Sequence, residues 1–416
     1  MAAKSRAPFP AMHYLRRTVQ MGIVVAAAVT GYRFASGLSL TSVEKYCPMG
    51  GMATSGSLAT QQRFSCATGE FNFALMVALL VLAILARKSF CSWLCPVGTL
   101  SELLGSVVGR LKGRTRQVKS GTSLALVVPP RQLDRWLRLL RYPVLFVILY
   151  ATFRSGELLF RPFCPYYVMF SFHGHNVELW SYALLSIFAL GVLIIPLLWC
   201  RYLCPLGGAL WPFSRVSLLR VRRHAEACTD CGLCDRACGQ SIPVATAADV
   251  TSGECTLCLE CTQVCPAPGA LSLAVPASNR RWPRVAVPAV VALLVVGGLW
   301  GGSIYAIPSF SQEFANADSA VELRSVRLQV QGVKCVDTAK LAATVFEGMG
   351  GIVSFVAYAS RNEVVIDFDA SQTTVEAIVK TMNGPVYIKS SGEFIFHIYQ
   401  VLQIDGKPVA KKLVTN

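Results

Sequence analysis

Eight cysteines between residues 228 and 265 have the spacing of iron–sulfur ligands. The pattern Cys-x-x-Cys-x-x-Cys-x-x-x-Cys occurs twice, first as Cys228, Cys231, Cys234 and Cys238, and then as Cys255, Cys258, Cys261 and Cys265. In bacterial two-cluster ferredoxins, three thiolates of each run bind one cube and the fourth binds the other. This rule predicts one [4Fe–4S] cluster on Cys228, Cys231, Cys234 and Cys265, and a second on Cys255, Cys258, Cys261 and Cys238. The alternative is a pair of tetrahedral zinc sites, which would need Cys-x-x-Cys pairs separated by a longer loop.

A second cysteine motif is duplicated earlier in the chain. Cys91-Ser-Trp-Leu-Cys95-Pro matches Cys200-Arg-Tyr-Leu-Cys204-Pro, and a lone Cys-Pro precedes each copy, at Cys47 and at Cys164. Two copies of one hairpin are indicated, with the lone Cys-Pro at its outer end. We expect Pro to stop a helix and the following Gly to let the chain turn back.

Cysteines four residues apart on a helix share one face, so two packed hairpins would bring four thiolates together. The sequence therefore predicts a redox or metal site at the membrane boundary from Cys91, Cys95, Cys200 and Cys204, and tentative metal ligands at Cys47 and Cys164. The alternative is that these cysteines are small buried apolar residues.

The composition indicates a protein embedded in a membrane. Of 416 residues, 53% are hydrophobic and only 15% are charged. Five windows are each about long enough to cross a hydrocarbon core of ~30 Å. They are Thr18–Ser36, Phe71–Arg87, Tyr142–Phe160, Leu179–Trp199 and Val285–Ile304. Retention of the first as an anchor is favoured over its cleavage as a signal peptide.

Basic residues indicate the orientation. Residues 110–141 carry nine Lys or Arg against one Asp, and short loops of this kind stay in the cytoplasm. We therefore expect a multi-pass protein of the bacterial cytoplasmic membrane, with the cysteine-rich module in the cytoplasm and the carboxyl end in the periplasm. The net charge of +16 then reflects topology and contact with anionic lipid, and a nucleic-acid partner is not expected.

The histidines argue against haem in the membrane. The five are His13, His173, His175, His224 and His397, none in the middle of a predicted span. A membrane b-type cytochrome needs axial histidines within its spans, so no haem is expected.

The carboxyl-terminal part has the pattern of a soluble α+β domain. Strands are predicted at Val321–Val330, Ile352–Tyr358, Glu363–Phe368 and Val386–Ile388, with helices at Thr338–Met349 and Thr374–Met382 capped by Thr373 or Thr374. This β-α-β-β-α-β order is the ferredoxin-like split βαβ fold. The domain resembles the heavy-metal-associated domain of copper chaperones. Its loop retains Cys335, while Thr338 replaces the second thiolate, so it either binds metal with an additional ligand or serves in docking.

The motifs together divide the chain into four parts. These are a membrane domain at residues 1–220, a two-cluster ferredoxin domain at 221–278, a fifth transmembrane helix at 279–305 and an extracytoplasmic heavy-metal-associated-like domain at 306–416. The expected fold class is therefore a membrane α-helical protein with about five transmembrane helices, a bacterial-type 2[4Fe–4S] module and a carboxyl-terminal α+β domain.

In these motifs the chain resembles the membrane polyferredoxins, which include NapH-type quinol dehydrogenase subunits, MauN-type maturation proteins, NosR regulators and CcoG/FixG maturation proteins. The resemblance implies an oxidoreductase or electron-transfer subunit. Electrons would come from a ferredoxin, a flavoprotein or quinol and go to an extracytoplasmic redox or metal-handling partner. One alternative is a quinol dehydrogenase subunit feeding a periplasmic reductase. Another is a redox or metal sensor, or an assembly scaffold.

Overall fold

The computed structural model describes residues 11–36, 43–52, 54–55, 69–111, 129–155, 160–171, 177–195, 197–276, 281–304, 308–314, 322–333, 336–387, 394–395 and 398–409. The chain divides into two compact units. The first unit comprises Met1–Val43, Leu75–Ala151 and Leu159–Leu299, and the second comprises Glu44–Ala74, Thr152–Leu158 and Trp300–Asn416. Each unit is described by itself.

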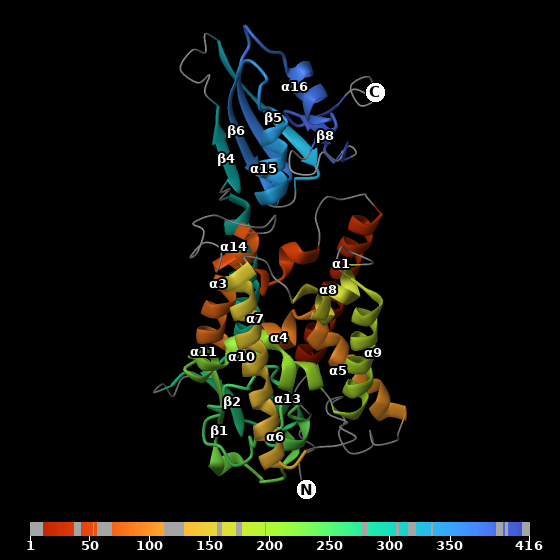
Figure 1. Cartoon of the computed structure of the whole chain (residues 1–416). Coiled ribbons are helices and arrows are strands. Elements are labelled where there is room, and N and C mark those ends of the chain that lie inside the picture. The colour runs from red at the N-terminus through yellow and green to blue at the C-terminus, as the bar shows by residue number, and fades with distance from the viewer. Residues whose placement is uncertain are drawn as a thin grey trace. The chain divides into compact units, whose positions relative to one another are not determined.

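Apolar helices make up much of the first unit, in which α5 contacts both α1 and α9 (Figure 1). The helices that precede the cysteine-rich module are α1 (Ala11–Ala35), α3 (Gly69–Ala86), α4 (Ser89–Trp93), α5 (Pro96–Leu111), α6 (Arg131–Leu137), α7 (Arg141–Ser155), α8 (Pro165–Phe170), α9 (Leu179–Ile194), α10 (Pro205–Ala209) and α11 (Trp211–Arg215). The helix α14 (Ala286–Ile304) follows that module. Short 3-10 turns are η1 (Val43–Tyr46), η3 (Arg138–Leu140), η4 (Arg161–Phe163) and η6 (Ala225–Ala227).

Three helical segments are long and apolar enough to cross a membrane. They are Met12–Ala35, Gln132–Arg154 and Ala286–Ile304. Two of the five predicted spans correspond to shorter apolar helices, Glu70–Ala86 and Leu179–Ile194. The membrane character of the chain is therefore supported by three helices, and the five crossings stay a prediction.

The cysteine-rich module carries the eight cysteines from Cys228 to Cys265. It is a small antiparallel sheet with one short helix in each cysteine run. Strands β1 (Arg220–Arg223), β2 (Leu271–Ala274) and β3 (Arg281–Trp282) pair in that order, so the two ends of the module meet. Helices α12 (Leu233–Ala237) and α13 (Glu260–Val264) contact each other. The apolar core of the module is shared with the membrane helices, because Leu79 and Leu82 of α3 and Val287 of α14 pack with Leu257 and Leu273.

The carboxyl-terminal part of the second unit is an antiparallel sheet covered by two helices (Figure 1). Its order is β11-β10-β5-β7-β6-β4, with bounds β4 (Phe310–Glu313), β5 (Leu323–Gln331), β6 (Ile352–Tyr358), β7 (Glu363–Asp369), β10 (Gln400–Ile404) and β11 (Lys407–Pro408). Alternate residues of β5 are buried and pack against α15 (Val336–Thr344) and α16 (Val375–Met382). Thr374 is the N-cap of α16, and its Oγ1 accepts a hydrogen bond from the Ala377 N–H at 3.3 Å.

Two predictions about this domain were wrong in detail. The strand predicted at Val386–Ile388 does not close the main sheet, because β8 (Val386–Tyr387) pairs with β9 (Phe394–Ile395) and β10 takes the place beside β5. The helix predicted to reach Met349 ends at Thr344, and the following turn contains Gly348 with a φ of 90°, which a helix does not allow. The likeness to a heavy-metal-associated domain stays a prediction.

Candidate iron–sulfur and membrane thiol sites

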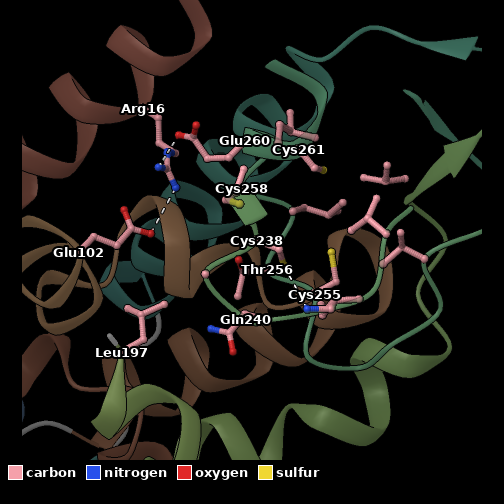
Figure 2. A pocket seen from close by; sticks show the side chains of 18 of the residues that line it. Arg16, Glu102, Leu197, Cys238, Gln240, Cys255, Thr256, Cys258, Glu260 and Cys261 are labelled. Carbon is pink, nitrogen blue, oxygen red and sulfur yellow. Dashed lines mark hydrogen bonds and ion pairs between the residues drawn. The ribbon is translucent and has the colours of Figure 1, made fainter. Parts of the chain in front are cut away.

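The eight cysteines of the module line two separate cavities. A cavity of about 20 Å³ is lined by Cys228, Cys231, Cys234 and Cys265, here called the distal set. A larger cavity of about 70 Å³ is lined by Cys238, Cys255, Cys258 and Cys261, here called the proximal set (Figure 2). The last cysteine of each run therefore lies with the first three of the other run, as the crossed ligand rule requires.

The two cysteine loops share a backbone conformation that has a steric cost. Asp230 and Gly232 of the first loop have φ values of 50° and 64°, and Leu257 and Leu259, at the same positions of the second loop, have 44° and 63°. Left-handed backbone is unfavourable for a residue with a Cβ and is concentrated at functional sites. Leu257 and Leu259 are each only 1% exposed, so packing of the two side chains holds this loop in its strained form.

The proximal set is more deeply enclosed than the distal set. Cys231 of the distal set is exposed, whereas burial raises the pKa of the Cys258 thiol to about 12, an effect that the positive charge of Arg16 opposes. Burial is also the main cause that raises the pKa of Cys261. Ligation to iron must displace these protons. The Ile242 N–H donates to Cys238 Sγ at 3.4 Å, a kind of bond that tunes cluster potentials.

The loop that carries Cys255 and Cys258, here called the proximal loop, packs directly on the motif that begins at Cys91. This motif and its copy at Cys200 are here called the membrane motifs. Ser92 Oγ donates to the Thr256 carbonyl oxygen at 2.8 Å, and Trp93 Nε1 donates to the Leu257 carbonyl oxygen at 3.2 Å. Trp93 is only 1% exposed. The residues next to Cys91 therefore hold the residues next to Cys255 and Cys258.

The duplicated membrane motifs have matching backbone geometry. The Cys95 N–H donates to the Phe90 carbonyl at 3.0 Å, and the Cys204 N–H donates to the Trp199 carbonyl at 2.8 Å. Each bond joins residues five positions apart, and in the second copy this bonding forms a π-helical turn, η5 (Trp199–Leu203). The repeat inferred from sequence is thus also a repeat in local structure.

The prolines of the two motifs lie between two helical segments. As predicted, a helical turn ends before each proline, α4 before Pro96 and η5 (Trp199–Leu203) before Pro205. Each proline is also the first residue of the next helix, α5 or α10, where a missing N–H costs nothing. The prediction that the two cysteines of a copy share one helix face was wrong, because the first lies within α4 or η5 and the second lies at the junction with the next helix.

The glycines of the motifs permit close approach of the backbone instead of a turn. A Cβ at Gly98 would lie 2.5 Å from the Cys91 carbonyl oxygen, and one at Gly207 would lie 3.4 Å from the Cys200 carbonyl oxygen. Each glycine therefore lies over the first cysteine of its own motif.

Cys91, Cys95, Cys200 and Cys204, here called the membrane thiol set, lie close enough to influence one another. Burial raises the pKa of Cys91, and the charges of Cys95 and Cys204 raise it further. Burial likewise raises the pKa of Cys200, with further contributions from Cys95, Cys204 and Cys91. The four thiols therefore lie within electrostatic range of one another in the first unit, and their joint role as a redox or metal site stays a prediction.

A buried layer of charge adjoins this set. Lys88 Nζ donates to Glu254 Oε2 at 2.6 Å, Arg141 Nη1 donates to the same oxygen at 3.0 Å, and Arg141 Nη2 pairs with Glu254 Oε1. Arg138 and Arg201 pair with Asp134, each at 2.7 Å. Four cations thus share two carboxylates in the described part of this layer, and burial of uncompensated charge is costly.

The cations of this layer lower the pKa of a cysteine of the membrane thiol set. Burial raises the pKa of Cys204, whereas backbone hydrogen bonds and the charges of Lys88 and Arg141 lower it. A thiolate-ligated iron–sulfur cluster carries net negative charge, so an excess of buried cations suits it.

Three other predicted ligands are not brought to these sites. Cys164 is half-buried as the N-cap of α8 in the first unit, and Cys47 follows η1 in the second unit. Cys335 lies outside the residues that the structure describes. Among the described residues, no group of three or more His, Cys, Asp or Glu is arranged to hold one metal ion. A [4Fe–4S] cube differs, because each thiolate binds a different iron atom.

Charged residues that connect the module to the membrane helices were not predicted from the sequence. Figure 2 shows Arg16 between Glu102 and Glu260 at the wall of the proximal cavity. No sequence motif singled out Arg16 or Lys88. The available signal was their position directly beside an apolar window and a cysteine motif.

Comparisons with known proteins match the same segments. A family model described as a 4Fe-4S binding domain matches residues 68–115 and 179–223, and each segment contains one membrane cysteine motif. A model described as a 4Fe-4S dicluster domain matches residues 220–275.

Relatives of the chain include proteins of several bacteria. YccM of Escherichia coli, a candidate electron transport protein, is 37% identical over 236 residues, which are 53% of this chain and 62% of YccM. Protein NirI of Paracoccus denitrificans is 30% identical over 44% of this chain and 25% of NirI. The ferredoxin-type protein NapH of Haemophilus influenzae is 28% identical over 45% of this chain and 63% of NapH. The match thus covers less than two thirds of each of these relatives. No solved structure matches significantly.

Proposed function

Because the chain belongs to the membrane polyferredoxin family, we propose that it relays electrons from its two module clusters to the membrane thiol set and onward across the membrane. It is a membrane iron–sulfur electron-transport protein. The observation that carries the proposal is the packing of the proximal loop on the first membrane motif, through the bonds from Ser92 and Trp93. A cluster on the proximal set would therefore lie beside the membrane thiol set.

The burial of the cysteines supports an order for the centres. The distal set includes an exposed cysteine, Cys231, so a soluble donor can approach a cluster there. The proximal cavity is walled by module residues and by Arg16 of α1, Glu102 of α5 and Leu197, which lies between α9 and η5. Electrons would therefore enter at the distal cluster and pass through the proximal cluster.

The third centre would be held by the membrane thiol set. The support is the convergence of Cys91, Cys95, Cys200 and Cys204, together with the buried excess of positive charge around Lys88 and Arg141. An iron–sulfur cluster at these cysteines would supply one-electron chemistry. The chain itself would exclude water, balance the charge and fix the spacing between neighbouring centres.

The acceptor is proposed to lie on the periplasmic side and to be a metal ion or a metalloenzyme cofactor under maturation. The basic loop at residues 110–141 favours a cytoplasmic module by the positive-inside rule. The carboxyl-terminal domain, with Cys335 in the predicted loop, would then handle metal or dock the partner, with Cys47 and Cys164 as ligands on that side. A single thiolate is a weak site for Cu(I), so Cys335 would need a second donor.

Metal analysis and EPR on the anaerobically purified full-length protein test this function. Acid-labile sulfide should accompany at least eight iron atoms, two four-iron clusters in the module, with additional iron for the third centre. Cys231→Ser and Cys258→Ser should each remove the signal of one module cluster and leave the other. Zinc in place of iron, with no EPR signal after reduction by dithionite, would refute the assignment.

A further inference from the structure

Arg16 is a buried cation of α1 that pairs with carboxylates from two other elements. Its Nη2 donates to Glu260 Oε1 at 2.7 Å, and its Nη1 donates to Glu102 Oε1 at 3.3 Å. The side chains of Arg16 and Glu260 are each 1% exposed. Solvent therefore screens this pair weakly.

Glu260 lies inside the proximal cysteine loop, between Cys258 and Cys261. Arg16, Glu260 and both of these cysteines line one cavity, with the guanidinium turned towards the Glu260 carboxylate (Figure 2). The buried Arg16 Nε also lacks a hydrogen-bond partner within the described residues. A donor of this kind suits a cavity whose occupant accepts hydrogen bonds, as cluster sulfurs do.

The electrostatic consequence follows from the charge change on reduction. A cluster gains one negative charge when it is reduced, so a nearby anion opposes reduction and a nearby cation favours it. Net charge and hydrogen bonds near the sulfurs are among the factors that set cluster potentials. Glu260 alone would make the proximal cluster harder to reduce, and Arg16 offsets that effect.

We propose that the Arg16–Glu260 ion pair sets the reduction potential of the proximal cluster, so that the first membrane helix controls electron flow out of the module. The inference rests on the proposed cluster at Cys238, Cys255, Cys258 and Cys261. Arg16 is a positioning and charge-compensating residue here, and it is not a ligand. His13 Nδ1 also lies 3.0 Å from Glu260 Oε1 and is left unchanged in every variant below.

Redox-poised EPR on the full-length protein tests the proposal. Arg16→Gln should shift the midpoint potential of the proximal cluster to more negative values, by about tenfold in the reduction equilibrium, or ~59 mV for one electron. Glu260→Gln should shift the same midpoint to more positive values. The double variant should lie near wild type, because removal of one positive and one negative charge leaves the net charge beside the cluster unchanged. The distal cluster should keep its potential throughout.

Arg17→Gln is the matched control. Arg17 is the next residue on α1, and among the described residues it forms an ion pair with Glu102 at 3.2 Å and not with Glu260. It should leave both midpoints unchanged. Arg16→Lys should keep the wild-type midpoint because the charge remains.

The outcomes separate the two levels of inference. A wild-type protein without a proximal cluster signal would overturn the proposed function. Two intact clusters with unchanged midpoints in Arg16→Gln and in Glu260→Gln would overturn only the tuning role. If Arg16→Gln loses the proximal cluster altogether, Glu260→Gln still tests the proposal. An unchanged midpoint potential in that variant would contradict the proposed tuning role.

Discussion

The indole N–H of Trp93 donates a hydrogen bond to the carbonyl oxygen of Leu257 at 3.2 Å. Trp93 lies two residues after Cys91, and Leu257 directly precedes Cys258. This bond joins a membrane cysteine motif to a cluster loop across 164 positions of sequence. The position of the proximal cysteine loop relative to the first membrane motif therefore depends on it.

Trp93→Phe should weaken this junction. The Leu257 carbonyl would lose its donor in a buried site, which costs about 1–3 kcal/mol, while most of the apolar contact would remain. We expect a lower Tm in detergent and slower electron transfer beyond the proximal cluster. Trp136→Phe is the control, because Trp136 is 70% exposed. Equal effects of the two changes would show that the Trp93 bond has no special role.

The two equivalent glycines should respond differently to the same change. Gly98→Ala places a Cβ 2.5 Å from the Cys91 carbonyl oxygen, whereas Gly207→Ala places one at 3.4 Å from that of Cys200. Overpacking of this kind costs about 1–3 kcal/mol, so Gly98→Ala should lower the Tm clearly and Gly207→Ala only slightly. The opposite ranking in thermal unfolding would contradict the geometry of the first motif.

Replacement of both Cys95 and Cys204 by Ala tests the membrane thiol set. The EPR signals of the module clusters should persist, because their ligands are untouched, but electron delivery to an acceptor on the far side should stop. Reconstituted vesicles with reductant on one side and an impermeant acceptor on the other measure this delivery. Unchanged delivery would return these cysteines to a packing role.

Glu254→Gln should destabilise the buried charge layer. Lys88 and Arg141 would lose the carboxylate that both contact, and breaking a buried pair by removing one partner costs about 3–5 kcal/mol. The measurement is the Tm in detergent, with Asp249→Asn as the control because its pairs with Arg222 and Arg220 are partly exposed. A smaller loss in Glu254→Gln than in Asp249→Asn would argue against the layer as a stabilising element.

The predicted orientation can be tested with reporter fusions. A reporter inserted near Lys112 should be active only as a cytoplasmic protein, and one fused after Asn416 only as an exported protein, as charge bias predicts. Activity of both on the same side would rule out the predicted odd number of crossings between these two positions.

Local patterns allowed several features to be predicted from the sequence. The ligand runs are short, so the spacing of Cys228 to Cys265 was enough to indicate two iron–sulfur clusters, and the duplicated Cys-x-x-x-Cys-Pro motif was enough to indicate a structural repeat. Period-two and period-3.6 patterns located β5, β6, β7 and the two helices of the carboxyl-terminal domain, including the cap at Thr374. Each of these signals depends on neighbours within about a dozen residues.

Contacts between distant segments depended on the tertiary structure. Arg16 with Glu260 and Lys88 with Glu254 are separated by 244 and 166 positions, and no local pattern links such partners. The pairing of β10 with β5, in place of the predicted strand at Val386–Ile388, depended on competition between two segments for one sheet edge. The sequence alone therefore determined which cysteines are candidate cluster ligands. Only folding decided which charges lie beside them, because burial creates the weak screening that makes those charges act on a cluster.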